Sequence, residues 1–431
     1  MSLRDETVRL LQELIRLDTV NPPGNETQAA ELLRGYLEPA GVECELYARV
    51  PERANLVARI PGRGDGPRLL LLSHTDTVLA DPAEWSVDPW SGELRDGHVW
   101  GRGALDMKGQ VAASAVTIAS LAREGFRPAG DLIFAATADE ELGEGVDYGL
   151  SWLCREHPEA ARCEYALNEG AGDRVELGGR VLYLCSSAEK RSSPFVLNVR
   201  GRSGHGSMPG IADNALVKAS RLIARLGEFR VEPRLTPETE GLLRAFADEV
   251  PAPDDALSVA GAVDPVAAEM IEPLLGLTVS PTMIEASQKR NVIPGRCEVT
   301  VDCRLLPGQT EAEVEAVLRE WLGAGDYELE WRDGQGGTRS PLDTPLWSAI
   351  EAFVEQLEPG ARLAPICVAG FTDSHWLREA FGTVAYGFFP LKAMSPELAA
   401  RLVHSADERV PVEDLELGVD FLRFAAQLVG R

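Results

Sequence analysis

Short apolar runs alternate with stretches of helical spacing over the first part of the chain. Three such runs, at 69–72, 132–136 and 165–167, each end in a cluster of polar and ionisable side chains. Runs of this length are typical of strands buried on both faces, and segment 107–124 has the spacing of a helix. The pattern predicts an α/β layer, in which ligands gather at the carboxyl ends of the strands.

The pattern changes after about residue 190. The order strand, helix, strand, strand, helix, strand predicts a small ferredoxin-like (βαββαβ) domain inserted into the α/β layer. Its expected elements are 195–199, 214–226, 277–284, 297–305, 311–322 and 327–331. The acidic, proline-rich segment 232–273 predicts a surface excursion with room for a short helix.

Helix and strand alternation resumes after Ser340, and the expected elements are 344–357, 383–387 and 412–429. A chain of 431 residues is longer than one hydrophobic core usually grows, so more than one domain is expected. We therefore divide it into a first part of the main domain (1–188), an inserted domain (189–336) and a second part of the main domain (337–431).

Composition and charge disfavour several classes of function. The net charge of −26 would repel phosphate backbones, so nucleic acid is not an expected partner. No apolar run is long enough to cross a bilayer, and residues 1–17 are spaced like an amphipathic helix rather than a secretory signal, which predicts a cytoplasmic protein. Seven cysteines without a CxxC pair predict buried thiols rather than disulfides or a thiolate zinc site.

Candidate metal ligands follow the first apolar run. His74 ends this run and Asp76 lies two residues on, where strand periodicity points both side chains to one face. A metal-bound histidine normally donates its second ring N–H to an oxygen, a role open to Asp76. Asp106 lies in a glycine-rich turn before a helix, where it fits either a helix N-cap or a carboxylate that bridges two cations.

Glu140 and Glu141 are adjacent at the end of the second run. Two neighbouring carboxylates are costly to ionise unless a cation compensates them, although an exposed acidic loop would also carry such a pair. Adjacency allows a division of labour, in which one glutamate binds metal and its neighbour reaches the attacking water.

Five ordered motifs carry a resemblance to a known family. They are His74-x-Asp76, Gly101-x-Gly103-x-x-Asp106-x-Lys108-Gly109, Asp139-Glu140-Glu141-x-Gly143, Asn168-Glu169-Gly170 and a late His404. In order and spacing they resemble the di-zinc hydrolases that include aminoacylase, acetylornithine deacetylase, succinyl-diaminopimelate desuccinylase and glutamate carboxypeptidase. The resemblance covers nearly the whole chain. It implies a zinc-peptidase-type three-layer α/β/α catalytic domain with an inserted ferredoxin-like domain that serves as lid and dimerisation domain.

The resemblance also implies the metal ligands, which are His74 and Glu169 for one zinc ion, Glu141 and His404 for a second, and Asp106 as the bridge. Each of the two Zn²⁺ ions then has three His or carboxylate ligands, as expected of catalytic zinc, although Co²⁺ or Mn²⁺ also suits such donors. Glu140 matches the general base of the family, and Asp76 supports His74. His375 has no place in the pattern, which assigns the late ligand to His404.

Substrate contacts are implied in the inserted domain. His205, in Gly201-Arg202-Ser203-Gly204-His205-Gly206-Ser207, matches the family histidine that stabilises the tetrahedral oxyanion, often from the partner subunit of a homodimer. A loop histidine without a role is the alternative. Asn291 and Arg304 match positions that bind the substrate carboxylate, and the Arg304 guanidinium suits a bidentate grip. An ordinary surface salt bridge is the alternative for Arg304.

A late glycine-rich loop supplies two further candidates, Gly370 and Thr372, which match family residues beside the substrate. Phe371 stands between them where many relatives have glycine, and this departure is expected to alter the side-chain pocket.

The implied reaction is hydrolysis of an amide or peptide bond next to a free carboxylate. The substrate is then a small peptide, as for a carboxypeptidase or dipeptidase, or an N-acyl amino acid, as for an aminoacylase-like deacylase. Segments 85–106 and 138–143 resemble the peptidase and N-acyl amino acid hydrolase branches more than the desuccinylases. An alternative of another class is a catalytically silent binding protein, which would be expected to have lost ligands or the base.

Overall fold

The structure is a computed structural model, and it describes residues 1–142 and 147–430. Gly143, the last residue of one motif, lies outside the described residues. The chain forms two compact units: the first is 1–187 with 340–366 and 372–431, and the second is 188–339 with 367–371. The borders expected from the sequence fall after residues 188 and 336.

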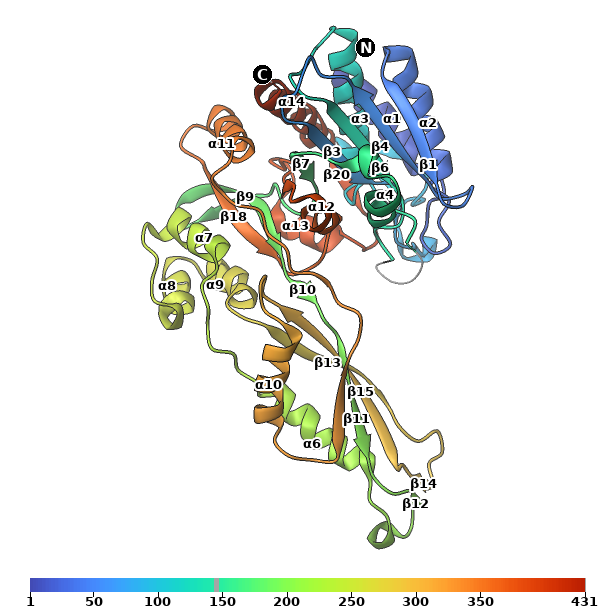
Figure 1. The fold of residues 1–431 in the computed structure, drawn as a ribbon, viewed down its shortest axis with the longest axis vertical. Coiled ribbons are helices and arrows are strands. Elements are labelled where there is room, and N and C mark those ends of the chain that lie inside the picture. Colours follow the sequence, from blue (N-terminus) through green and yellow to red (C-terminus); the bar gives the residue numbers. More distant parts are fainter. Residues whose placement is uncertain (143–146, 431) are drawn as a thin grey trace. The chain divides into compact units, whose positions relative to one another are not determined.

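The first unit is built on a nine-stranded sheet in the order β1-β2-β6-β3-β7-β19-β9-β18, with β8 paired to β9 (Figure 1). The strands are β1 (Glu43–Ala48), β2 (Ala54–Ile60), β3 (Leu69–His74), β6 (Leu132–Thr137), β7 (Tyr165–Asn168), β8 (Arg174–Leu177), β9 (Arg180–Glu189), β18 (Arg362–Val368) and β19 (Val384–Gly387). Neighbours among β6, β3, β7 and β19 run parallel, whereas β1 and β2 are antiparallel. The carboxyl ends of β6, β3 and β7 therefore lie at one edge of the sheet.

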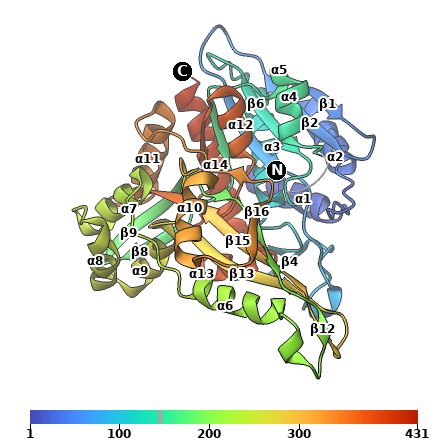
Figure 2. The same cartoon turned by 60° about the horizontal axis from the view of Figure 1, so that its bottom comes forward.

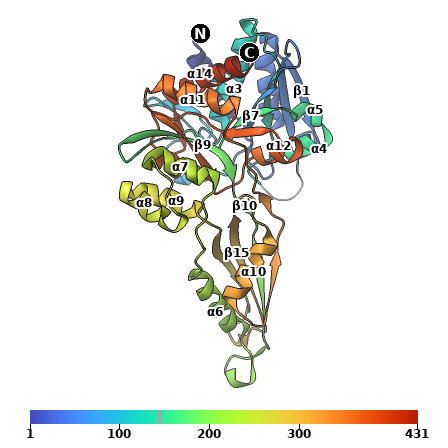
Figure 3. The same ribbon diagram turned by 60° about the vertical axis from the view of Figure 1, so that its left-hand side comes forward.

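Helices cover both faces of this sheet (Figure 3). One face carries α1 (Leu3–Ile15), α2 (Thr27–Leu37), α3 (Lys108–Arg123), α11 (Pro345–Leu357) and α14 (Val412–Val429); the other carries α4 (Leu150–Glu156), α5 (Pro158–Ala161) and α12 (Ser374–Phe381). Within β3, Leu69 and Leu71 belong to the first core and Leu70 and Leu72 to the second, as the period of two requires. The α/β fold predicted from the sequence is confirmed.

Smaller elements complete the first unit. They are α13 (Pro396–Leu402), the short helices η1 (Glu38–Ala40) and η2 (Pro82–Glu84), and the three-stranded sheet of β4 (Glu93–Arg95), β5 (His98–Trp100) and β20 (Arg409–Pro411). In this sheet Trp100 pairs with Arg409, so the glycine-rich turn after β5 lies beside the segment that carries His404.

The second unit has a six-stranded sheet in the order β16-β11-β15-β10-β17, with β13 also paired to β15 (Figure 2). Its elements are β10 (Arg191–Ser192), β11 (Phe195–Arg200), α6 (Ala215–Gly227), β13 (Thr278–Glu285), β15 (Arg296–Leu305), α10 (Glu311–Leu322), β16 (Tyr327–Trp331) and β17 (Gln335–Gly336), with the strand pair β12 (Gly204–His205) and β14 (Val292–Ile293) and the short helix η3 (Pro209–Ile211). The strand β15 is antiparallel to both β11 and β13.

The excursion at 232–273 is more helical than expected. It contains α7 (Pro237–Ala247), α8 (Ala256–Val263) and α9 (Pro265–Ile271), with η4 (Pro253–Asp255) and η5 (Glu272–Leu274) beside them. Thr236 caps α7 by accepting the Thr239 N–H, and Leu242, Leu243 and Phe246 are buried. The helical spacing of these apolar residues is the signal that the proline content masks.

All seven cysteines are free thiols; six are buried and Cys44 is half-buried. Among the described residues, no helix has the length and apolar character needed to cross a membrane.

Candidate metal centre

The carboxyl ends of three neighbouring strands bring the predicted ligands together. His74 is the last residue of β3, Glu141 follows β6, and Glu169 comes directly after β7. Because the strand order is β6-β3-β7, His74 lies between the two glutamates. Asp106 and His404 are added by loops, the first by the glycine-rich turn before α3 and the second by the segment after α13.

These five side chains form two groups that share one carboxylate. Asp106 belongs with His74 and Glu169 in one group and with Glu141 and His404 in the other, and the ligand atoms of each group lie within 4.8 Å of one another. Asp106 Oδ1 is 3.2 Å from His74 Nε2, and Asp106 Oδ2 is 3.1 Å from His404 Nε2. The two oxygens of Asp106 thus face different histidines, as a bridging carboxylate must.

The spacing of the donor atoms fits metal ions. Atoms that lie about 2.0–2.1 Å from a tetrahedral zinc ion are about 3.3 Å from one another. The corresponding separations here are 3.1 Å between His404 Nε2 and Glu141 Oε2 and 3.8 Å between His74 Nε2 and Glu169 Oε2. Within the described residues, the buried Oε1 of Glu141 has no hydrogen-bond donor. Donor types, spacing and this orphaned oxygen all suit cations at the two groups.

The pKa values in the cluster reflect its excess of carboxylates. Burial, reinforced by the charge of Asp106, raises the pKa of Glu169 to about 6. Burial also raises the pKa of Glu140 well above its usual range, and the charge of Glu169 adds to the shift. Hydrogen bonds to Asp106 and Glu141 raise the pKa of His404 to about 10. The cluster therefore stabilises positive charge, which is what a cation site requires.

Asp76 has a wider role than support of the His74 ring. The ring nitrogen Nδ1 of His74 is 3.1 Å from the backbone oxygen of Asp76 and 3.4 Å from its carboxylate Oδ1. The same carboxylate accepts the backbone N–H groups of Glu140 (3.3 Å) and Glu141 (3.1 Å). Asp76, which is fully buried, thus fixes the loop that carries the candidate base and one ligand.

Glu408, for which the sequence predicted no role, holds the turn of Asp106 in the same way. Its buried carboxylate accepts the backbone N–H groups of Gly103, Leu105 and Asp106 at 2.8–3.0 Å and the Arg102 guanidinium at 2.6 Å. Its position four residues after the candidate ligand His404 was a signal that it lies near the site. Sequence alone does not distinguish a glutamate that binds backbone N–H groups of a loop, which we call a clamp, from a solvated glutamate.

Asp373 is a second residue for which the sequence predicted no role. It is 5% exposed and accepts a hydrogen bond from Thr137 Oγ1 at 3.1 Å. Burial raises the pKa of Asp373 well above its usual range, opposed by His74 and reinforced by Asp76 and Glu169. Asp373 therefore adds a further buried carboxyl group beside the ligands.

The late loop contributes differently at its two candidate positions. Thr372 belongs to the first unit, where its Cγ2 lies 3.8 Å from the place that a Cβ on Gly170 would take, next to Glu169. Gly370 belongs to the second unit, as does Phe371. His375 is buried in α12 and 3.4 Å from Glu379, and it is not part of either ligand group.

The remaining candidates lie in the second unit, at two separate places. His205 pairs with Val292, and Gly206 donates its N–H to the Asn291 carbonyl at 2.8 Å, so His205 and Asn291 are neighbours. Arg304 lies near the far end of β15 and forms a fork with Asp302 at 3.0–3.2 Å. The strand β15 begins at Arg296, shortly after Asn291 along the chain. At about 3.3 Å per residue, Arg304 lies roughly 25 Å from that first residue of the strand.

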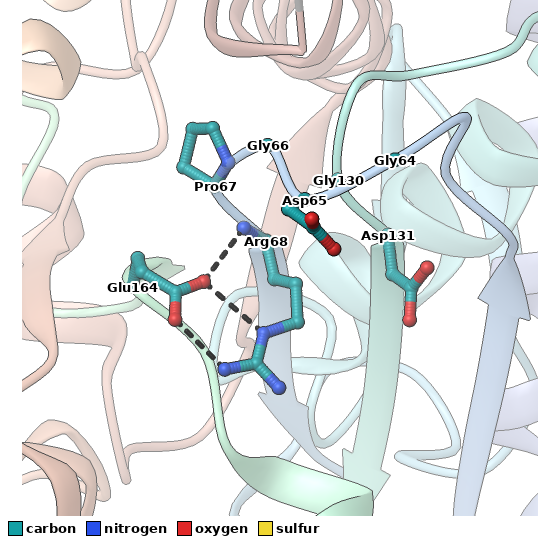
Figure 4. Close-up of a pocket in the computed structure, with 8 residues that line it drawn as sticks. All are labelled: Gly64, Asp65, Gly66, Pro67, Arg68, Gly130, Asp131 and Glu164. Carbon is teal, nitrogen blue, oxygen red and sulfur yellow. Dashed lines mark hydrogen bonds and ion pairs between the residues drawn. The ribbon is translucent and has the colours of Figure 1, made fainter.

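A hollow of about 500 Å³ lies at the opposite edge of the first sheet, before β3 and β7 (Figure 4). Its lining residues are Gly64, Asp65, Gly66, Pro67, Arg68, Gly130, Asp131 and Glu164. Figure 4 shows the Arg68 guanidinium turned onto Glu164, with Nη2 at 2.7 Å from Oε1. The positive charge of Arg68 is thus already neutralised by Glu164. None of the candidate site residues lines the hollow.

Comparison with known proteins identifies the family of this chain. The model of peptidase family M20/M25/M40 matches residues 70–427. The chain therefore belongs to this family of metal-dependent hydrolases, which act on small substrates by cleaving amide bonds.

Individual relatives are similar to this chain in sequence or in fold. A succinyl-diaminopimelate desuccinylase of Methylobacterium sp. (strain 4-46) is 29% identical, covering 94% of this chain and 92% of the relative, and one of Cereibacter sphaeroides (strain ATCC 17025 / ATH 2.4.3) is 28% identical with 95% of both covered. An M20 family metallo-carboxypeptidase from Sulfolobus solfataricus has a similar fold, with a TM-score of 0.73, 18% identity and 99% of both chains covered. A dinuclear metal-binding M20 peptidase from Bacillus subtilis gives a TM-score of 0.63, 14% identity and coverage of 99% of this chain and 98% of that one.

Proposed function

We propose that this chain is a two-zinc hydrolase that cuts an amide bond next to a free carboxylate in a small substrate, as a carboxypeptidase or dipeptidase does. The observation that carries the proposal is the Asp106 carboxylate shared between two ligand groups, each completed by one histidine and one glutamate. These donors suit Zn²⁺ and also admit Co²⁺ or Mn²⁺.

Glu140 is the proposed general base. Bound metal ions would lower the pKa of a water molecule and polarise the scissile carbonyl. Glu140 takes the proton from the attacking water and delivers it to the leaving nitrogen. Its backbone N–H is fixed by Asp76, which also holds the N–H of the neighbouring ligand Glu141, so the candidate base lies next to the metal ligands.

Substrate binding is assigned to the second unit and the late loop. In this proposal Arg304 and Asn291 bind the substrate carboxylate, Gly370 and Thr372 line the substrate, and His205 stabilises the oxyanion. The roughly 25 Å along β15 prevents one small molecule from touching Arg304 and His205 of the same chain. We therefore assign His205 and Asn291 to the site of the partner subunit in a homodimer.

The edge of the second sheet supports such a dimer. In the described part of the chain β13 pairs with β15 alone, and Met283 (60% exposed) and Ile284 (47% exposed) lie on it. An exposed edge strand offers unpaired backbone groups, and two apolar side chains on it favour burial against a second copy.

Removal of an acyl group from an N-acyl amino acid is the second candidate function. It is favoured by the relatives named desuccinylase, which cover more than nine-tenths of the chain. The expectation that segments 85–106 and 138–143 resemble the peptidase and N-acyl amino acid hydrolase branches more than the desuccinylases stays a prediction. The two functions share Glu140 and all five ligands, so the choice depends on the substrate pocket.

Metal content and a substrate panel test the proposal together. Metal per chain is measured by mass spectrometry, and hydrolysis of dipeptides, N-acetyl and N-succinyl amino acids is followed before and after chelation. Two ions per chain with chelator-sensitive cleavage of dipeptides supports the first function, and preference for N-acyl substrates replaces it with the second. Absence of turnover with zinc, cobalt or manganese restored would favour a silent binding protein.

A further inference from the structure

The candidate base follows a residue whose backbone is held from outside its own loop. Asp139 has φ of +66°, in the left-handed region that L-residues seldom adopt. Its carboxylate Oδ1 accepts hydrogen bonds from Asn21 Nδ2 and Arg53 Nη2, both at 3.0 Å, and Oδ2 accepts the Tyr148 N–H at 3.0 Å. Side chains distant in sequence thus fix the residue directly before Glu140.

Asn21 connects the carboxylate of Asp139 to that of Asp76, which binds the backbone of the loop that carries Glu140. Its side-chain amide nitrogen donates to Asp139 Oδ1 and also to Asp76 Oδ2, at 2.9 Å for the second bond. Asp76 in turn accepts the backbone N–H groups of Glu140 and Glu141. Both hydrogens of one buried amide group therefore tie together the two carboxylates that set the course of the loop.

Arg53 anchors the network to the turn at 21–26. Its guanidinium forms a fork with Glu26, with distances of 2.5 and 2.7 Å, and Nη1 donates to the Pro23 carbonyl at 3.0 Å. Arg53 is 5% exposed and Glu26 is fully buried. Gly24 leaves room for this arrangement, since a Cβ there would come within 2.2 Å of the guanidinium. A forked, buried arginine has a fixed geometry that lysine cannot reproduce.

We propose that Asn21 and Arg53 are positioning residues that hold Glu140 in place for proton transfer. The inference rests on the proposed function, because it needs Glu140 to be the base. Asn21 and Arg53 act through Asp139 and Asp76 on the backbone of the loop. Their loss displaces Glu140 while the five ligands stay in the chain, so turnover falls more than metal or substrate binding.

A double-mutant cycle with Glu140 tests the inference. Arg53→Lys and Asn21→Ala are each made in the natural chain and in the Glu140→Gln chain, and kcat, KM and metal content are measured. In the natural background we expect kcat to fall on the order of 10- to 100-fold, with KM within about 3-fold and metal unchanged. In the Glu140→Gln background we expect less than about 3-fold further loss, because the group being positioned is already gone.

The outcomes separate the two hypotheses. Near-normal turnover of Glu140→Gln would overturn the base and hence the proposed function. Suppose instead that Glu140→Gln is impaired. The positioning role is then wrong if Arg53→Lys and Asn21→Ala lower kcat equally in both backgrounds, and it is also wrong if they leave kcat unchanged in the natural chain. Two variants are used so that a folding failure of one leaves the other to decide.

Arg59→Lys is the matched control. Arg59 lies on β2, shortly after Arg53, and forms an ion pair with Asp131 at 2.6 Å, away from the loop of Glu140. Arg59→Lys replaces an ion-paired arginine by lysine, as Arg53→Lys does, but outside the network around Glu140. We expect Arg59→Lys to leave kcat unchanged in both backgrounds.

Discussion

Buried and half-buried carboxylates at one edge of the first sheet form two groups that differ in what faces them. Asp76 and Glu408 point at backbone N–H groups, two for Asp76 and three for Glu408. Asp106, Glu141 and Glu169 point at one another and at two histidine rings. The chain itself satisfies the first group, whereas the second needs positive charge from outside. The same residue type thus serves as clamp or as ligand according to the donors around it.

Removal of the shared ligand is the strongest way to break this comparison. Asp106→Ala is expected to lower metal content and to reduce kcat/KM by at least about 10³-fold, because both ions lose a ligand and each supplies several kcal/mol of charge stabilisation. Mass spectrometry and steady-state kinetics measure the two effects. Two tightly held ions in this variant would show that Asp106 is not the bridge.

Removal of a clamp should instead lower stability. Glu408→Gln places an amide against three backbone donors and leaves the buried Arg102 without a charged partner, so the free energy of unfolding should fall by roughly 3 kcal/mol. Urea denaturation of the chelated protein measures it. Glu358→Gln is the control: Glu358 is forked by Arg174 with both side chains 23% exposed, and about 1 kcal/mol is expected. Equal losses would contradict the distinction.

The second unit should show an effect on substrate binding without an effect on metal. Arg304→Lys loses the planar fork, and we expect KM to rise about 10-fold with metal content unchanged. Arg296→Lys, on the same strand and paired with Glu298, is the control with no expected change. An Arg304→Lys enzyme with normal KM would leave Arg304 as the partner of Asp302 alone.

Lys190, a fully buried lysine, extends the comparison from buried carboxylates to a buried positive charge. Burial lowers the pKa of Lys190 to about 8, and its ammonium donates to the Pro273 carbonyl at 2.8 Å. The unfolded chain, with a lysine pKa of about 10.4, binds more protons between these values, so Lys190 makes stability rise from pH 8 to about pH 10.4. Lys190→Met removes a charge-burial cost and one hydrogen bond, for a net gain of roughly 1–2 kcal/mol at pH 7.

The gain should shrink as pH rises through that window and vanish above it. Urea denaturation at pH 7, 9 and 10.5 measures the difference between the two proteins. A difference that does not depend on pH would show that packing, and not charge burial, sets the effect of Lys190.

Strongly periodic segments were predictable because the spacing of their apolar residues can be read along the chain without knowing which elements they pack against. The runs that became β3, β6 and β7 are apolar on both faces, and the helix expected at 412–429 is α14. The excursion at 232–273 was underestimated, since prolines that start helices read as loop signals when neighbours are unknown. Phe371 remains an unexplained departure from the family loop.

The sequence by itself determined the α/β class and the family, and the resemblance named the candidate ligands, because apolar periodicity and the order of motifs can be read along the chain. Only the tertiary structure decided which carboxylates meet donors and which meet each other. Glu408 and Asp76 are clamps because β20 pairs with β5 and β6 lies beside β3, which aligns backbone N–H groups with their oxygens. Hydrogen bonding is directional and acts over about 3 Å, so the role of a carboxylate depends on contacts that sequence separation hides.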